Sequence, residues 1–231
     1  MDWIAELDRA TSSFAAVLDD GNLEAAVPAC PGWTLRDLAD HLGGVHHWAR
    51  HAVVEGNPGG STEPAPTGRT ALAAWYRGHA ERLLRTLAET PVDAPVWTFG
   101  PEPHTAAFWR RRQVHETVMH LWDAHASQGR RTDLDPALAL DGLDEVVGVF
   151  YPRQVHLGRT TPLPAGLRLV VDDAPDHPGF TLGDGPAVRV AGTASALLLL
   201  LWHRLDLDQS GARIDGDPAQ VAHLLDHAIT P

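Results

Sequence analysis

A carboxylate and an imidazole stand one helical turn apart in the middle of the chain, at Glu116 and His120. The surrounding run, residues 109–123, contains no glycine or proline, and its residue pattern predicts a helix. Side chains four residues apart on a helix lie on one face, so this pair could supply two ligands to a borderline divalent metal. Such pairs also occur on solvated helix faces, where they contribute only about 0.2–0.5 kcal/mol. A metal site therefore requires a third ligand from elsewhere in the chain.

The spacing separates this helix from the metalloprotease motif H-E-x-x-H, in which both histidines bind zinc. His115 precedes Glu116, but the residue three places after the glutamate is Met119, and the next histidine is His120. His115 and His120 lie roughly 140° apart around a helix, so they cannot bind one ion. If this helix binds a metal, Glu116 is a ligand rather than a general base.

A second predicted helix offers the third ligand. It carries four histidines, at His41, His46, His47 and His51. Only His41 lies at the edge of the apolar face, where it could face another helix. A buried histidine bonded to a backbone carbonyl is the competing interpretation of this position. If the two helix edges meet, His41, Glu116 and His120 leave one coordination position open, as in catalytic zinc sites.

The composition bounds the class of protein. The 231 residues suffice for one large or two modest domains, and the apolar content of 44% is typical of a globular protein. The net charge of −12 with only 18 Lys+Arg argues against binding to nucleic acid or to an anionic membrane surface. The single cysteine excludes an intramolecular disulfide. The N-terminus lacks a signal-peptide pattern, and the longest apolar run, 196–202, is too short to span a bilayer. We expect a cytoplasmic protein.

Hydrophobic periodicity predicts four long helices in the first half of the chain. They are expected at about residues 3–19, 34–55, 69–90 and 105–128. Thr34 is the expected N-cap of the second helix, with Asp37 at the capping-box position. Helices of this length with polar connections predict a four-helix bundle, and bundles build metal sites from facing helices.

The second half of the chain has a mixed pattern. A helix at about 136–150 is followed by strand-like runs at 166–173, 180–182, 187–190 and 212–214. Thr193 caps a very apolar helix through Trp202, and Asp217 opens a last helix. We therefore expect an all-α metal-binding bundle over residues 1–130 and a small α+β C-terminal domain over residues 131–231.

Two N-terminal motifs carry a family resemblance, residues 30–42 (CPGWTLRDLADHL) and residues 112–124 (RQVHETVMHLWDA). Together they resemble the mycothiol-dependent maleylpyruvate isomerase family, which belongs to the DinB-like metal-binding four-helix bundles. Residues 188–194 and 214–217 resemble the C-terminal domain of that family, which is related to sterol-carrier folds. The resemblance covers most of the chain.

The resemblance implies a divalent metal, usually zinc, on His41, Glu116 and His120. It also implies mycothiol as the thiol cofactor, bound to the metal through sulfur. A metal lowers the pKa of a thiol and holds it as the reactive thiolate. In the isomerase, this thiolate adds to a conjugated cis double bond, and rotation and elimination give the trans product. Relatives transfer the thiol to an electrophile instead.

Arg204 matches an arginine of the family's C-terminal domain and is the candidate catalytic residue, as a cationic clamp for an acidic substrate. The family commonly has glycine before that arginine, where this chain has His203. Arg112 lies near the metal face by helical geometry, although a surface salt bridge explains it equally well.

Three further residues have both functional and structural interpretations. Trp33 and Trp109 could wall a pocket, but a tryptophan at a helix edge is more often a packing residue. Cys30, between Ala29 and Pro31 with no basic neighbour, is expected to be a packed structural thiol rather than a nucleophile.

The sequence thus predicts an enzyme that isomerises or S-conjugates a small electrophile with a metal and mycothiol. Two other classes stay open. One is a non-catalytic module that binds a metal or a small ligand. The other is a metal hydrolase that uses bound water and no thiol.

Overall fold

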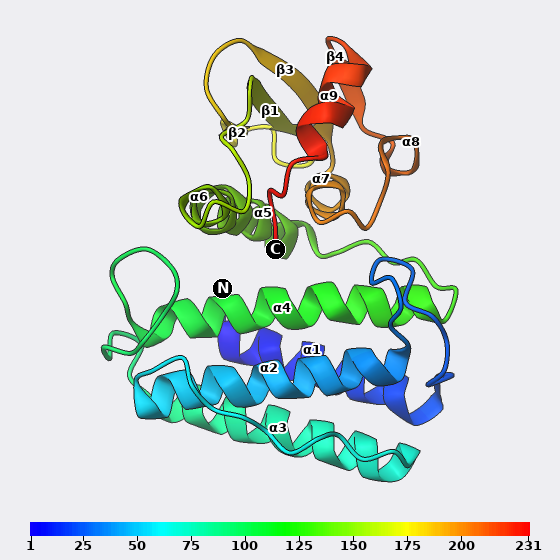
Figure 1. The fold of residues 1–231 in the computed structure, drawn as a ribbon, viewed down its shortest axis with the longest axis vertical. Helices are drawn as coiled ribbons and strands as arrows, with labels where there is room; N and C mark the ends of the chain where they lie inside the picture. The colour runs from blue at the N-terminus through cyan, green and yellow to red at the C-terminus, as the bar shows by residue number, and fades with distance from the viewer. The chain divides into compact units, whose positions relative to one another are not determined.

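The computed structural model describes residues 1–231, which divide into two compact units, Met1–Thr132 and Asp133–Pro231. The first unit contains four long helices, and the second combines shorter helices with a 4-stranded sheet (Figure 1). The predicted fold class, a helical bundle followed by a small α+β domain, is confirmed. No helix combines the length and the apolar composition that crossing a bilayer requires.

The helices of the first unit are α1 (Trp3–Asp20), α2 (Leu35–Glu55), α3 (Arg69–Glu89) and α4 (Ala106–Ser127). Each lies within two residues of its predicted range. Helix α2 packs against α3 and α4, and α1 packs against the same two helices. The bundle therefore has four sides, and α2 and α4 share one of them.

The bundle is held together by side chains that lose nearly all contact with water. Phe14 of α1 and Tyr76 of α3 are fully buried, with ring centroids 4.8 Å apart. Leu38 of α2 and Leu72 and Leu83 of α3 are also fully buried. Burying each such side chain contributes roughly 1.5–3 kcal/mol relative to leaving it exposed.

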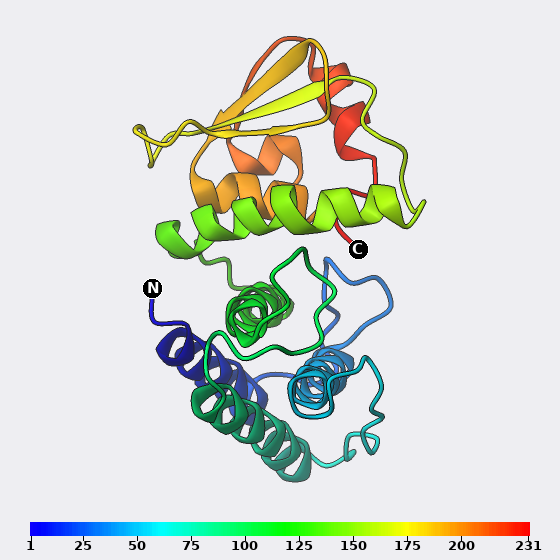
Figure 2. The same ribbon diagram turned by 90° about the vertical axis from the view of Figure 1, so that its left-hand side faces the viewer.

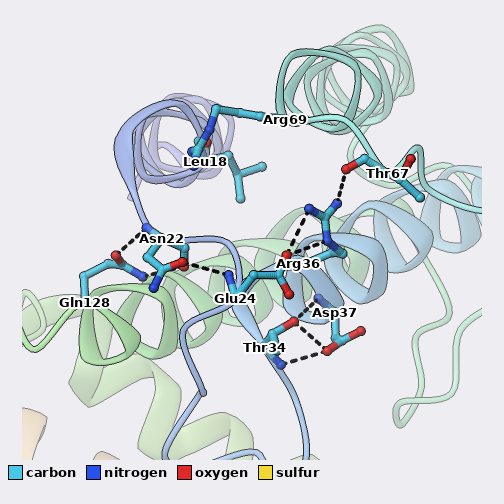
Figure 3. Close-up of polar contacts among 9 residues, drawn as sticks. All are labelled: Leu18, Asn22, Glu24, Thr34, Arg36, Asp37, Thr67, Arg69 and Gln128. Carbon is cyan, nitrogen blue, oxygen red and sulfur yellow. Dashed lines mark hydrogen bonds and ion pairs between the residues drawn. The ribbon is translucent and has the colours of Figure 1, made fainter.

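The start of α2 is fixed by a capping box, as predicted. The Asp37 backbone N–H donates to Thr34 Oγ1 at 3.3 Å, and the Thr34 N–H donates to Asp37 Oδ2 at 2.8 Å (Figure 3). The hydrogen bonds from Thr34 hold the pKa of the Asp37 carboxyl below its ordinary value. A bridge between Ala26 and Thr34 pins the preceding loop to the same point. The register of His41, about two turns into α2, follows from this start.

Three further polar contacts connect the loops at this end of the bundle (Figure 3). The Arg36 guanidinium donates to Glu24 Oε1 at 3.2 Å and to the carbonyl of Thr67 at 2.6 Å. Gln128 Oε1 accepts from the Asn22 N–H at 2.7 Å. The chain segments after α1, before α3 and after α4 are thereby joined where α2 begins.

Helix α4 is buried around most of its circumference. Its buried residues include the apolar Val114 and Trp122, but also the fully buried Asp123 and the nearly fully buried Gln113. The cause is that α4 packs against α1 and against α2, so two of its faces are covered within the bundle. Polar groups buried in this way require hydrogen-bonding partners.

The second unit begins with one continuous helical run, made of α5 (Pro136–Glu145), a π-helical turn (Val146–Phe150) and α6 (Tyr151–His156). The predicted end at residue 150 is therefore too early. Pro152 lies inside this run, just after the π-helical turn.

Four strands form the sheet, in the order β2-β1-β3-β4. Their bounds are β1 (Gly166–Val171), β2 (Phe180–Leu182), β3 (Ala187–Gly192) and β4 (Arg213–Asp215). The central strands β1 and β3 are parallel, and the outer pairs are antiparallel. Figure 2 shows α7 (Ala194–Leu201) and the α5–α6 run on one face of the sheet. Two short helices complete the unit, α8 (Leu207–Ser210), which was not predicted, and α9 (Pro218–Leu225).

Replacing Thr34 by alanine removes the hydroxyl that caps α2. We expect the Thr34→Ala variant to lose about 1 kcal/mol of stability, because one N-terminal N–H of the helix loses its partner. Urea denaturation measures the change. Thr67→Ala is the matched control, since the exposed Thr67 contributes its backbone carbonyl to the Arg36 contact. Equal stability of the two variants would contradict the role of the cap.

Candidate metal centre

Three donor groups converge between α2 and α4. His41 Nε2 and His120 Nε2 each lie 3.4 Å from Glu116 Oε1, and one ligand atom from each residue falls within 4.8 Å of the others. Tetrahedral zinc with bonds of about 2.0–2.1 Å places neighbouring ligand atoms about 3.3 Å apart. The structure thus brings together all three residues that the sequence nominated as ligands, with a donor set and spacing that fit a divalent cation.

The antiparallel packing of α2 on α4 produces this convergence. The ring centroids of His41 and His120 lie 4.9 Å apart. One turn further along α2, His46 Nε2 lies 3.1 Å from Thr117 Oγ1. His41 of α2 therefore lies beside His120 of α4, and the later residue His46 lies beside the earlier residue Thr117, as expected for antiparallel helices. In this packing, His41 contacts Glu116.

Each α4 donor is held by a neighbour on the same helix. The Arg112 guanidinium pairs with Glu116 Oε2, and Asp123 Oδ2 lies 2.9 Å from His120 Nδ1. The surface interpretation of Arg112 is wrong, since only 4% of its side chain is exposed. The contact of Asp123 with His120 was not predicted from the sequence. The spacing of residues 112, 116, 120 and 123 places all four side chains on one face of the helix. This spacing could have predicted both the Arg112–Glu116 and the His120–Asp123 contact.

The charges of the site are strongly coupled. Burial alone would raise the pKa of the Glu116 carboxyl, but the Arg112 charge and hydrogen bonds from His120 and His41 hold it well below its ordinary value. Burial likewise lowers the pKa of His120, but hydrogen bonds to the Asp123 and Glu116 carboxylates outweigh it and raise that pKa to about 9. Glu116 is therefore anionic at neutral pH, and any cation bound by His120 must displace a proton.

His46 lies beside this site in a neutral form. The Thr117 hydroxyl donates to the Gln113 carbonyl at 2.7 Å, so its oxygen accepts from His46 Nε2–H. Nδ1 of His46 is buried without a hydrogen-bonding partner. Burial is the main cause that lowers the pKa of His46 to about 3. This histidine is a fully buried core residue of the bundle, so the prediction that only His41 among the α2 histidines borders the apolar face toward another helix is wrong.

Comparison with known proteins assigns both units. The family model for the mycothiol maleylpyruvate isomerase N-terminal domain matches residues 4–125, and the model for the MDMPI C-terminal domain matches residues 137–223. The chain belongs to the mycothiol maleylpyruvate isomerase family.

Relatives and solved structures extend this result. Two proteins of Mycobacterium tuberculosis, from strains CDC 1551 and H37Rv and both named uncharacterized, are each 26% identical over 160 residues, covering 66% of this chain and 82% of theirs. The crystal structure of a histidine-to-alanine mutant of the mycothiol-dependent maleylpyruvate isomerase matches with a TM-score of 0.62 and 16% identity, covering 86% of this chain and 87% of that chain. A crystal structure of the mycothiol-dependent maleylpyruvate isomerase matches over the same shares, with 16% identity and a TM-score of 0.57. These structures share the fold.

The two residues weighed as pocket walls differ in their surroundings. The Trp33 ring lies 4.9 Å from the His41 ring and is partly buried. Trp109 is fully buried, and its Nε1–H donates to the Trp97 carbonyl at 2.6 Å. Trp109 is thus a packing residue, and Trp33 borders the candidate ligands.

Cys30 packs partly buried against the hydrophobic core of the bundle. Its Sγ lies 3.9 Å from Asp123 Oδ2. A neighbouring carboxylate disfavours a thiolate electrostatically, so these surroundings support the expectation of a structural thiol.

Arg204 belongs to the second unit, at the end of α7. Its Nη1 donates to the Trp202 carbonyl at 2.8 Å, and its guanidinium lies 5.6 Å from the Trp202 ring centroid. The N–H groups of Arg204 and His203 donate to the carbonyls of Leu199 and Leu200 at 2.8 and 3.0 Å, which is a Schellman motif. His203 takes the left-handed position of that motif, with φ of 55°. This conformation accounts for the glycine that the family resemblance leads one to expect there.

The neutral state of buried His46 predicts a specific pH dependence of stability. Below pH about 6.5 the unfolded chain protonates His46, whereas the folded protein resists protonation until about pH 3, so stability falls as the pH is lowered. Between pH 7.5 and 5.0, metal-free wild type is expected to lose about 2 kcal/mol more than His46→Gln. Urea denaturation with a chelator present measures both.

The control for this comparison is His51→Gln, a substitution at a partly exposed histidine of the same helix. It should retain the pH dependence of the wild type. Parallel stability curves for wild type and His46→Gln would show that the buried histidine does not contribute.

Proposed function

We propose that this chain is a metal- and thiol-dependent enzyme that isomerises or S-conjugates a small electrophile, with mycothiol as the thiol. The observation that carries the proposal is the convergence of His41, Glu116 and His120 in a chain of this family. Two imidazoles and one carboxylate form a zinc-type donor set, and three protein ligands leave one position for an exogenous group.

The partial exposure of the donor residues suits a cofactor that must bind and dissociate. His41 keeps 35% of its side chain exposed and Glu116 keeps 18%, so a small molecule can reach the donor atoms. His120 is more deeply buried, and its side chain lies between Glu116 and Asp123. The site therefore combines one accessible ligand with two ligands fixed on α4.

A bound divalent cation would stabilise the thiolate form of a thiol cofactor and so supply the nucleophile. The protein itself offers no competing nucleophile at this place, because Cys30 lies beside the Asp123 carboxylate. Glu116 contributes negative charge, and the histidines contribute neutral nitrogen donors. In this proposal, the side chains of the protein bind the cation and orient the thiol cofactor, and the reacting sulfur belongs to the cofactor.

We assign Arg204 the role of the cationic group that binds an acidic substrate. Its guanidinium is already oriented by the Trp202 carbonyl and the Trp202 ring. An arginine fork held in this way suits a carboxylate, because it can donate two parallel hydrogen bonds.

Metal binding tests the triad directly. Purified wild type is expected to bind one equivalent of zinc, and Glu116→Ala or His120→Ala to bind none, with helix content retained. Elemental analysis and circular dichroism are the measurements. Glu89→Ala, at an exposed glutamate on α3, should bind metal like the wild type. Full zinc content in the Glu116 or His120 variants would contradict the assignment.

Thiol dependence separates the enzyme from its two rivals. With zinc bound, we expect turnover of a cis-configured conjugated dicarboxylate only when mycothiol is added. Metal-dependent hydrolysis of an ester or amide without any thiol would instead support a hydrolase, and metal binding without turnover of any electrophile would support a binding module. In the same assay, Arg204→Met should raise KM for acidic substrates and leave KM for neutral electrophiles unchanged; equal effects on both would exclude the clamp.

A further inference from the structure

Four side chains form a continuous ladder along one face of α4. Arg112, Glu116 and His120 follow at intervals of four residues, and Asp123 stands three residues further. Each step of the ladder is a polar contact: Arg112 with Glu116 Oε2, His120 Nε2 with Glu116 Oε1 at 3.4 Å, and His120 Nδ1 with Asp123 Oδ2 at 2.9 Å. The two candidate ligands therefore lie between two charged residues that are not ligands.

We infer that Arg112 and Asp123 are positioning residues that fix how the two α4 ligands present themselves to a cation. Asp123 selects the tautomer of His120, and Arg112 restricts Glu116 to one coordinating oxygen. This inference rests on the proposed metal site. It also explains why a bound cation would keep one coordination position open for a thiol: Glu116 would contribute only one oxygen.

The case for Asp123 follows from hydrogen-bond chemistry. An ionised carboxylate can only accept, so the hydrogen between Asp123 Oδ2 and His120 Nδ1 belongs to the imidazole. In a neutral imidazole, the lone pair is then on Nε2, the nitrogen that faces Glu116 Oε1. Asp123 is fully buried, so water does not compete for the contact. A carboxylate on the far nitrogen also makes an imidazole a more basic ligand.

The case for Arg112 follows from the different partners of the two Glu116 oxygens. Oε2 accepts from the buried Arg112 guanidinium, whereas Oε1 faces the Nε2 atoms of His41 and His120. Bidentate coordination by Glu116 would require Oε2 to leave Arg112 and to share the ion. The guanidinium contact opposes that movement. One-oxygen coordination by Glu116 leaves the fourth position of a tetrahedral ion open.

A purely structural role is the alternative for both residues. Buried charged pairs often maintain helix packing and contribute little else. A structural role predicts lower stability and unchanged metal properties of the folded protein. A positioning role predicts altered affinity and an altered coordination spectrum at constant helix content.

The experiment uses the full chain loaded with Co²⁺, whose visible absorption reports coordination number and symmetry. Asp123→Ala should lower metal affinity by about 10–100-fold in competition with a chelator. Asp123→Asn should show a smaller loss, because its amide oxygen still accepts from His120 without the charge. Arg112→Met should weaken the visible bands of the Co²⁺ protein, as expected when Glu116 becomes bidentate and coordination number rises. Arg112→Lys should retain the wild-type spectrum, since one donor to Oε2 remains.

Arg110→Met is the matched control on the same helix, because Arg110 donates to the Thr90 carbonyl at 2.7 Å and not to a ligand. It should leave affinity and spectrum unchanged. Wild-type affinity in both Asp123 variants and a wild-type spectrum in Arg112→Met would overturn the inference while the metal site stands. If Asp123→Ala fails to fold, Asp123→Asn decides, and wild-type affinity there overturns the role of Asp123. Failure of the wild type to bind either zinc or Co²⁺ would instead overturn the proposed function.

Discussion

The Glu116 carboxylate imposes the constraint on which the candidate metal site depends. A buried negative charge is costly unless positive or hydrogen-donating groups surround it. In this protein, Arg112 contacts one oxygen and two histidines face the other. Two of these three partners come from α4 itself, and the third comes from α2. Groups from both α2 and α4 thus surround the charge of this one side chain.

This constraint explains why α4 carries so many polar residues in a buried position. A helix that packs on two sides would ordinarily be apolar on both. Here one covered face carries Arg112, Glu116, His120 and Asp123, and each is paired with another of the four. The apolar interior of leucines and aromatic rings supplies the stability, and the paired polar face carries the candidate ligands. The capping box at Thr34 and the loop contacts beside it keep α2 in the register that the pairing requires.

The fold was largely predictable from sequence, and so was the placement of two of the three candidate ligands. Glu116 and His120 are related by helix geometry alone, so their common face follows from their spacing. His41 was placed at the edge of the apolar face by helical geometry, but the same geometry did not predict that His46 is fully buried beside Thr117 of α4. The burial of Arg112 could not be derived, because it depends on which helices cover α4. The extension of the helical run to His156 was missed, since Pro152 reads as a helix stop unless the π turn before it is known. Helix α8 is too short for periodicity to detect.

The end of α7 has a consequence for how Arg204 can move. Its backbone N–H is one of the two that close the helix terminus, so the main chain at this residue is hydrogen-bonded to the end of α7 although it lies beyond the last helical residue. A left-handed residue with a side chain costs roughly 1–2 kcal/mol, and here His203 bears that cost while the two terminal hydrogen bonds are kept. Any change in the position of the guanidinium must therefore come from rotation about the side-chain bonds, with the Cα atom held in place. The guanidinium can therefore reach only positions within one side-chain length of a Cα atom that is fixed at the end of α7.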